Sequence, residues 1–283
     1  MGTMKKALRM CIPVLCVLAL SAGPAGAWIL VDGDFNASAD SADLRANSPG
    51  QDWYESRGDL QTLLTLNTDN IGGNSTKKAA LLNYGIARNA YLTQEFSPAQ
   101  TGRFMVGFDI YIDRIENSGN YDRTGHVFIG NDSITGNAPT GTGAERFICL
   151  AFYDPTPGTT GNDIQLRSIT NSAPTGMWAN TSQWYRIGGT GLTFSYDTWY
   201  SIMLDINFPD KIYDVYVNNA LVATGVAGNS AYTGNALEYI SFIADSDARG
   251  DFYVDNVFPI PPAAWLLGSG LLGLVALRRR MKK

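Results

Sequence analysis

The sequence predicts an all-β protein whose central domain is an antiparallel double-sheet sandwich of the jelly-roll type. Three observations carry this prediction. Apolar and polar residues alternate with a period of two over several long stretches. Pieces rich in Gly, Asn, Thr and Pro, such as 136–143 and 155–161, separate these stretches. The helical period is not sustained beyond two turns anywhere in the central domain.

Four stretches alternate clearly enough to be predicted as strands, over 103–113, 200–208, 213–217 and 251–258. In each, one set of side chains faces a core and the other set faces solvent. Asn218-Asn219 predicts a hairpin turn that leads into Leu221-Val222. The residues predicted to face inward are Phe104, Val106, Phe108, Ile110, Ile112, Tyr200, Ile202, Leu204, Ile206, Phe208, Tyr213, Val215, Val217, Phe252, Val254 and Phe258.

Charge is distributed unevenly along the 283 residues. All 26 acidic residues lie between Asp32 and Asp255, together with 13 of the 21 basic residues, so this part carries a net charge of −13. Such a domain lacks the basic surface that nucleic acid requires, and nucleic acid is excluded as a partner. The chain contains one histidine, and Cys149 is the one cysteine beyond residue 16. Multi-histidine metal sites, cysteine-based zinc sites and disulfides within the domain are therefore excluded.

Residues 1–27 have the three parts of a secretory signal peptide. Basic residues open the segment, and the apolar run 11–20 follows, too short to span a bilayer. Ala25 and Ala27 supply the small side chains that signal peptidase needs, which places the cleavage before Trp28. The central domain is then expected to cover residues 28–257.

Residues 258–283 form a second distinct segment. A proline cluster precedes the uncharged apolar stretch 263–277, and Arg278, Arg279 and Arg280 follow directly. This order predicts a short transmembrane helix with a positive stop on the cytoplasmic side of the inner membrane. A buried core helix, the other interpretation, is disfavoured by the three successive arginines.

The segment also resembles a known sorting signal. Phe258 to Leu267 (FPIPPAAWLL), the helix and the basic tail are similar in order to the PEP-CTERM signal in its VPLPA-type form. The resemblance implies a Gram-negative, exopolysaccharide-producing bacterium, recognition by an exosortase and cleavage near Pro259, Ile260, Pro261 and Pro262. It also implies delivery to the cell surface or extracellular matrix. Phe258 and Pro262 depart from the usual valine and alanine.

A second resemblance lies in the central domain. Residues 197–205 (DTWYSIMLD) and 213–219 (YDVYVNN) are similar to a hairpin of concanavalin A-like and laminin-G-like bacterial domains. Residues 251–257 (DFYVDNV) are similar to the last strand of these domains, and equally to galactose-binding-like modules. The resemblance implies a concanavalin A-like sandwich, a fold whose members bind or cleave polysaccharides.

A catalytic carboxylate pair is not predicted. Asp109 and Asp113 share a strand face but are about 13 Å apart at the usual rise, whereas glycosidases hold the pair within about 5 to 9.5 Å. Glu116 falls on the opposite face. No G-x-S-x-G is present, His126 is interpreted as a surface or packed residue, and Cys149 as a small core residue. The domain is thus expected to have no catalytic residues; the alternative is a polysaccharide hydrolase or lyase of the same fold.

A structural calcium ion is the candidate cofactor. Asp32 and Asp34 open the domain and Asp255 lies near its end, and first and last strands are often neighbours in a jelly roll. Carboxylate oxygens are the ligands that calcium prefers. The spacing is not that of an EF-hand, because Ala37 stands where the tight turn needs glycine.

Tyr111 and Tyr216 are the candidate sugar-binding platform, because both alternate out of apolar strands. Asp109, Asp214 and Asn218 could hydrogen-bond to sugar hydroxyls. The stretch with Trp178, Trp184 and Tyr185, expected to be loop-rich, is the alternative platform, unless its tryptophans only cap the core. The sequence thus predicts an exported, exosortase-sorted surface or matrix protein that is either carbohydrate-binding or purely structural.

Overall fold

A computed structural model describes residues 30–46, 52–116, 118, 121–132, 143–156, 163–170 and 184–260. The chain forms a compact unit over Ile29–Ile260. The predicted signal peptide, with Ala25 and Ala27, lies outside the described residues, as do Pro261, Pro262, the predicted transmembrane stretch 263–277 and Arg278–Arg280. Among the helices of the described part, none is long and apolar enough to cross a membrane.

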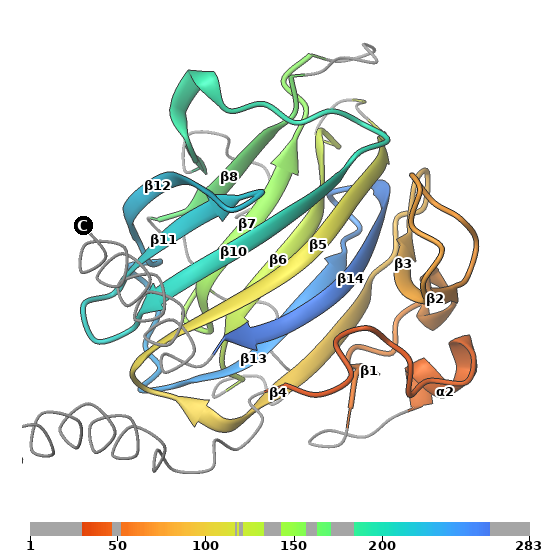
Figure 1. The fold of residues 1–283 in the computed structure, drawn as a ribbon, viewed down its shortest axis with the longest axis horizontal. Helices are drawn as coiled ribbons and strands as arrows, with labels where there is room; N and C mark the ends of the chain where they lie inside the picture. Colours follow the sequence, from red (N-terminus) through yellow and green to blue (C-terminus); the bar gives the residue numbers. More distant parts are fainter. Residues whose placement is uncertain are drawn as a thin grey trace, which may run out of the picture. The chain divides into compact units, whose positions relative to one another are not determined.

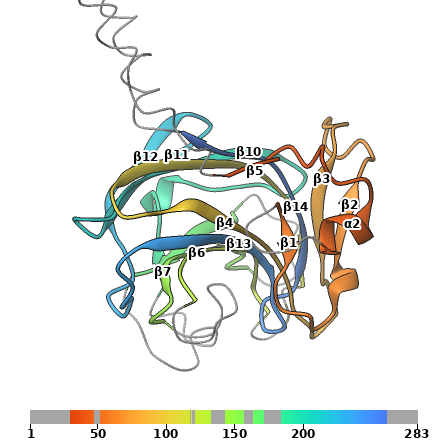
Figure 2. The ribbon, with the colours of Figure 1, turned by 90° about the horizontal axis from the view of Figure 1, so that it is seen from below.

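Two antiparallel sheets of seven strands each make up the described fold, and Figure 2 shows them as two layers. Sheet A has the order β1 (Tyr54–Glu55), β4 (Ala90–Gln100), β13 (Leu237–Ala244), β6 (Arg123–Gly130), β7 (Arg146–Tyr153), β8 (Gln165–Ile169), β9 (Trp184–Arg186). Sheet B has the order β12 (Ala220–Ala227), β11 (Ile212–Val217), β10 (Trp199–Asn207), β5 (Arg103–Ile115), β14 (Gly250–Ile260), β3 (Lys78–Leu82), β2 (Leu64–Asn67).

Helical structure in the described residues is limited to short pieces at the edges of the sheets (Figure 1). These are α2 (Ser41–Ala46), η1 (Gln61–Leu63) and η3 (Gly189–Gly191). The prediction of an all-β antiparallel sandwich is confirmed, since the described strands pair antiparallel throughout both sheets.

The core lies between the sheets and follows the predicted alternation. The inward-facing residues of β5, from Phe104 to Ile112, are at most 1% exposed, and they pack against residues of sheet A such as Phe242. Asn218 and Asn219 both have positive φ, 49° and 66°, as a two-residue hairpin turn requires. The turn pairs Val217 with Ala220 and Tyr216 with Leu221, and the register of β11 against β12 then shifts between Tyr213 and Tyr216.

The end of β14 differs from the prediction. Between Asp255 and Phe258 the strand bulges, with Asn256 at a φ of 48°, so Val257 takes the inward position instead. Phe258 therefore points outward, and its ring lies over Gly107 of β5. The strand continues through Pro259 and Ile260, the first residues of the predicted sorting motif.

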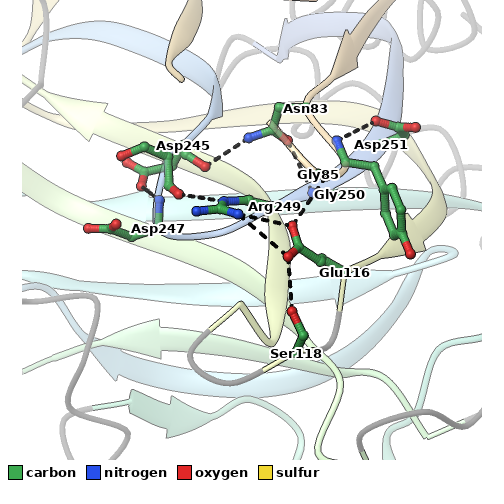
Figure 3. Close-up of polar contacts among 11 residues, drawn as sticks. Asn83, Gly85, Glu116, Ser118, Asp245, Asp247, Arg249, Gly250 and Asp251 are labelled. Atoms are coloured by element: carbon green, nitrogen blue, oxygen red, sulfur yellow. Dashed lines mark hydrogen bonds and ion pairs between the residues drawn. The ribbon is translucent and has the colours of Figure 1, made fainter. Parts of the chain in front are cut away.

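A polar network holds the turn between β13 and β14 (Figure 3). Asn83 donates to the carbonyl of Asp245 at 2.8 Å and accepts from the amide of Gly250 at 3.1 Å. Arg249 donates to the carbonyl of Ser246 at 2.9 Å and lies 3.5 Å from Glu116. Because these bonds join the turn to the segments after β3 and β5, the end of sheet A is tied to sheet B.

Candidate functional site

The backbones of the first and last segments of the domain meet, but the three predicted calcium ligands are not grouped as a metal site. The amide of Val257 donates to the carbonyl of Gly33 at 2.8 Å, next to Asp32 and Asp34. The carboxylate of Asp255 is fully buried and accepts from the side chains of Asn74 and Thr76, both at 2.7 Å. In the described part of the chain, no three His, Cys, Asp or Glu side chains are grouped to hold a metal.

Asp32 is the most perturbed of these three carboxyls. Its pKa is raised to about 6, chiefly by burial and also by the nearby Asp52 and Asp34, against the lowering effect of the hydrogen bond from the Ala37 amide. Asp34 is exposed and accepts from the side chain of Asn36 at 2.6 Å. Calcium binding by Asp32, Asp34 and Asp255 stays a prediction.

The carboxylates weighed as a catalytic pair have separate partners. Asp109 accepts from the side chain of Asn256 at 2.8 Å. Asp113 lies 3.7 Å from Arg114, and Glu116 lies 3.5 Å from Arg249. Each carboxylate is thus held by a neighbouring segment of the fold.

The expected exposure of Tyr111 is wrong. Its side chain leaves the core on the outer face of sheet B, as predicted, but is only 6% exposed. The segment at Ile71 and Gly72 covers it: a Cβ at Gly72 would lie 2.5 Å from the Tyr111 ring. Trp199 fixes this segment by donating to the carbonyl of Ile71 at 2.8 Å. The ring is packed against Trp199 and Tyr253, so it is not available to a ligand.

Tyr216 is half-buried and lies in a row of apolar side chains that crosses five strands of sheet B. Its partner on β12 is Leu221, which is 54% exposed, and its partner on β10 is Met203, which is half-buried. Met203 pairs with Gly107 of β5, and Gly107 pairs with Phe258 of β14, which is 38% exposed. We call Leu221, Tyr216, Met203, Gly107 and Phe258 the apolar row.

Polar side chains border the apolar row on both sides. On one side Asp205 is paired with Arg103 at 2.6 Å, and Asp214 accepts from Thr224 at 2.9 Å. On the other side stand Asp109 and Asn218, and Asn218 accepts from the amide of Ser201 at 3.0 Å. The predicted residues Asp109, Asp214 and Asn218 are thus near Tyr216 on this face, and each also supports the local backbone or a neighbouring strand.

The hydroxyl of Tyr216 keeps its proton to a higher pH than usual. Partial burial raises its pKa, and the carboxylates of Asp205 and Asp214 raise it further against Arg103. Tyr216 therefore carries a hydroxyl hydrogen at neutral pH, with carboxylate acceptors nearby.

The residues of the alternative aromatic platform do not share one face, because Trp184 and Tyr185 are neighbours in the strand β9. Trp184 and Tyr185 lie in this strand instead of a loop, and Trp178 lies outside the described residues. Alternation separates the two: Trp184 is 8% exposed and packs on the outer face of sheet A, whereas Tyr185 is 50% exposed. They do not form one surface.

Sequence reasoning missed Leu221, Met203 and Phe258. The position of Leu221 could have been predicted, because a two-residue turn at Asn218-Asn219 places it opposite Tyr216. The outward position of Phe258 could not, because the bulge that turns it outward has no clear signal in the alternation.

The interpretation of Cys149 as a small core residue is confirmed, and His126 is packed and not on the surface. Both lie on the outer face of sheet A, in or beside a second buried cluster. Burial raises the pKa of Cys149 to about 12, which keeps the thiol protonated. Burial, together with Arg123 and Arg146, holds the pKa of His126 well below its usual range, so the ring is neutral at pH 7.

No protein-family model matches the chain, and no curated protein matches it. A sialidase is 12% identical with a TM-score of 0.48; the match covers 81% of this chain but only 18% of the sialidase. The GH131 β-glucanase catalytic domain from Podospora anserina is 17% identical with a TM-score of 0.46, covering 84% of this chain and 100% of that domain. The Emp47p carbohydrate recognition domain is 14% identical with a TM-score of 0.44, covering 77% and 91%.

Proposed function

We propose that this chain is an exported cell-surface or matrix protein whose concanavalin A-like sandwich binds a neutral polysaccharide on the outer face of sheet B. The apolar row carries this proposal: Tyr216 and Phe258 lie in one register line, with Met203 and Gly107 between them. A line across neighbouring strands, which lie about 4.8 Å apart, suits an extended linear ligand.

The chemistry of the row favours a sugar over other ligands. Aromatic rings present an electron-rich face to the C–H groups of a pyranose, and tyrosine adds a hydroxyl. The carboxylates of Asp205, Asp214 and Asp109 beside the row accept hydrogen bonds from sugar hydroxyls and repel an anionic chain. Two copies stacked through this face would bring like carboxylates together, which disfavours self-association.

Binding without cleavage is the better supported activity. Cleavage of a glycosidic bond requires a general acid and a second carboxylate on opposite sides of the bond. Asp205, a diagonal neighbour of Tyr216 on β10, is paired with Arg103, and Asp214 holds the backbone of β12 through the amide of Gly225 at 2.7 Å. Among the described residues, no carboxylate pair supports the hydrolase alternative.

Replacing Tyr216 by alanine is expected to weaken binding of a neutral β-glucan about tenfold, because one stacking ring is lost. The wild-type dissociation constant is expected between about a millimolar and a micromolar, since an open face buries little area. Calorimetric titration measures both. Tyr185→Ala, which removes an exposed tyrosine from sheet A, is the matched control. Equal affinities for wild type and Tyr216→Ala would reject this face, and no binding to any neutral glycan would favour the structural role.

The proposal includes export and sorting. Signal peptidase would cleave after Ala27, and an exosortase would act near Pro259–Pro262 on the membrane-anchored intermediate. What supports this is the order of proline motif, apolar stretch and arginines in residues 258–283.

Changing Arg278, Arg279 and Arg280 to serine is expected to release more unprocessed protein in soluble form. The fifteen-residue apolar run 263–277 is short for stable spanning without a strong flanking charge. Fractionation followed by intact-mass measurement shows where each form accumulates. A triple Arg→Lys variant keeps the charge and should behave as wild type. Unchanged retention and processing of the serine variant would argue against a sorting signal.

A further inference from the structure

The outer face of sheet A gathers positive charge in an otherwise acidic domain. Four arginines each hold the guanidinium carbon over an aromatic ring of this face, in the pairs Arg57–Tyr91 (4.8 Å to the ring centroid), Arg146–Phe128 (4.1 Å), Arg123–Trp184 (5.4 Å) and Arg167–Tyr153 (3.6 Å). A fifth, Arg186, is the cross-strand partner of Arg167. We call these nine residues the arginine–aromatic face. They include five of the 13 basic residues between Asp32 and Asp255.

The pairs follow the strands from one side of the sheet to the other. Tyr91 lies on β4, Phe128 on β6, Tyr153 on β7 and Trp184 on β9. Tyr91, Phe128 and Trp184 belong to one apolar cluster that is separate from the inter-sheet core. These three side chains are at most 8% exposed, so the cluster is itself packed, and the accessible part of the face consists of Tyr153 and the arginines Arg57, Arg167 and Arg186.

Described carboxylates neutralise part of this charge, since Asp122 acts on Arg123 and Arg167 and Asp245 acts on Arg57 and Arg146. Arg123 pairs with Asp122 at 2.7 Å, but Arg57, Arg167 and Arg186 form no ion pair with any described carboxylate. Arg167 instead donates twice to the neutral amide oxygen of Gln165, at 3.0 and 2.7 Å. Arg186 donates to the carbonyls of Thr190 and Leu192.

Three of the arginines lie within electrostatic range of one another. Burial lowers the pKa of Arg167; Tyr153 and Asp122 act against this, and the charges of Arg123 and Arg186 act with it. Arg123 is only 2% exposed, and its Nη1 is buried with no hydrogen-bond partner in the described part of the structure. Like charges held together at a partly buried site repel, and an anion would relieve that repulsion.

We infer that the arginine–aromatic face is a second binding site, which takes the acidic groups of a polysaccharide such as a polyuronate. The accessible members, Arg57, Arg167, Arg186 and Tyr153, make the contacts, and the buried Arg123 and Arg146 add to the positive potential beneath them. This site does not rest on the proposed neutral-glycan site, which lies on the other sheet.

The geometry selects the ligand in two ways. A guanidinium presents a planar set of donors that matches a carboxylate with two parallel hydrogen bonds. Arg167 and Arg186 are direct partners on neighbouring strands, so their backbones are spaced by about one strand separation, close to the length that one sugar residue adds to a linear chain. Tyr153 beside Arg167 offers a ring face for the sugar itself.

The test is titration of the full-length protein with polygalacturonate, with Arg167→Ala and Arg186→Ala as separate variants. Each is expected to weaken binding about tenfold, because one charge-assisted pair is lost. Arg167→Lys keeps the charge without the planar donors, so its affinity should lie between those of the wild type and Arg167→Ala. Binding should also weaken as salt rises from about 0.05 to 0.5 M. Unfolding midpoints of the variants show whether a loss of binding is a loss of fold.

Controls separate the two faces. Arg103→Ala removes a positive charge from the outer face of sheet B, and Tyr216→Ala alters the apolar row; both should bind polygalacturonate as wild type does. Failure of wild type to bind polygalacturonate would overturn the inference. Arginine variants that bind polygalacturonate as tightly as the wild type would also overturn it. So would single-stranded DNA that binds as tightly as polygalacturonate and loses affinity with the same variants, because the face would then be a general polyanion surface.

Discussion

Replacing Gly33 by alanine is expected to lower the free energy of unfolding by roughly 3 kcal/mol or more, as buried steric clashes do. A Cβ at this position would lie 1.5 Å from the carbonyl oxygen of Val257 and 2.6 Å from its carbon. These are backbone atoms of the last strand, so a rotamer change cannot relieve the overlap. The clash would also displace the hydrogen bond from the Val257 amide to the Gly33 carbonyl.

Urea denaturation monitored by tryptophan fluorescence measures the effect, because Trp53 donates to the carbonyl of Asp32 at 3.1 Å, next to the contact between Gly33 and Val257. Gly102→Ala is the matched control: no atom lies within 4 Å of a Cβ there, and its stability should change by less than about 1 kcal/mol. A Gly33→Ala variant as stable as the Gly102→Ala variant would show that the first segment does not hold the end of β14 in place.

The second large effect concerns a buried carboxyl next to the turn of Figure 3. Burial raises the pKa of Asp245 to about 6, against the lowering effect of the hydrogen bond from the Asp247 amide; the charge of Asp247 also raises the pKa, while Arg146 and Arg57 lower it. The folded state therefore binds the proton more tightly than the unfolded chain, whose carboxyl has the ordinary value of 3.8. The stability that this group contributes is present below about pH 4 and is lost as the pH rises through 6.

Asp245→Asn is expected to be as stable as wild type near pH 4 and more stable at pH 7, by up to about 3 kcal/mol. Asparagine keeps the oxygen that accepts from the amide of Asp247 at 2.8 Å. Urea denaturation of both proteins between these pH values gives the difference in their free energy of unfolding. The contributions of other titrating groups, such as His126, cancel in this difference. Asp247→Asn, at an exposed neighbouring position, is the control. It removes a charge that raises the pKa of Asp245 but leaves the buried carboxyl in place, so its gain in stability between the two pH values should be smaller than that of Asp245→Asn. A flat difference for Asp245→Asn would mean that its carboxyl is solvated.

Part of the fold could be read from alternation because each strand has one face in a continuous core. Residues 103–113 show this best: the apolar positions from Phe104 to Ile112 are buried between the sheets as predicted. The hairpin at Asn218-Asn219 was predictable for a local reason, since both residues tolerate positive φ. Such features depend on neighbours in the chain alone.

The candidate sites were less predictable because they depend on what covers an outer face. Tyr111 and Tyr216 show the same alternation. The segment at Ile71 and Gly72 nevertheless buries Tyr111, whereas Tyr216 is only half-buried. Alternation reports the face of a side chain and cannot report a distant loop that packs on that face. Phe258 shows the other limit, because one extra residue in β14 moves it from the inner to the outer face.

The sequence by itself determined the fold class, the hairpin register and the net charge, because these follow from local periodicity, turn chemistry and counting. Only the tertiary structure decided where the charge lies. The domain carries −13 overall, and Arg57, Arg123, Arg146, Arg167 and Arg186 are scattered over 130 positions of the chain without a motif. Antiparallel pairing of β6, β7, β8 and β9 brings four of them onto one face, and Arg57 joins them over the ring of Tyr91 on β4. Strand order, which arises from long-range packing, thus gathers on one face basic side chains that are far apart in the sequence.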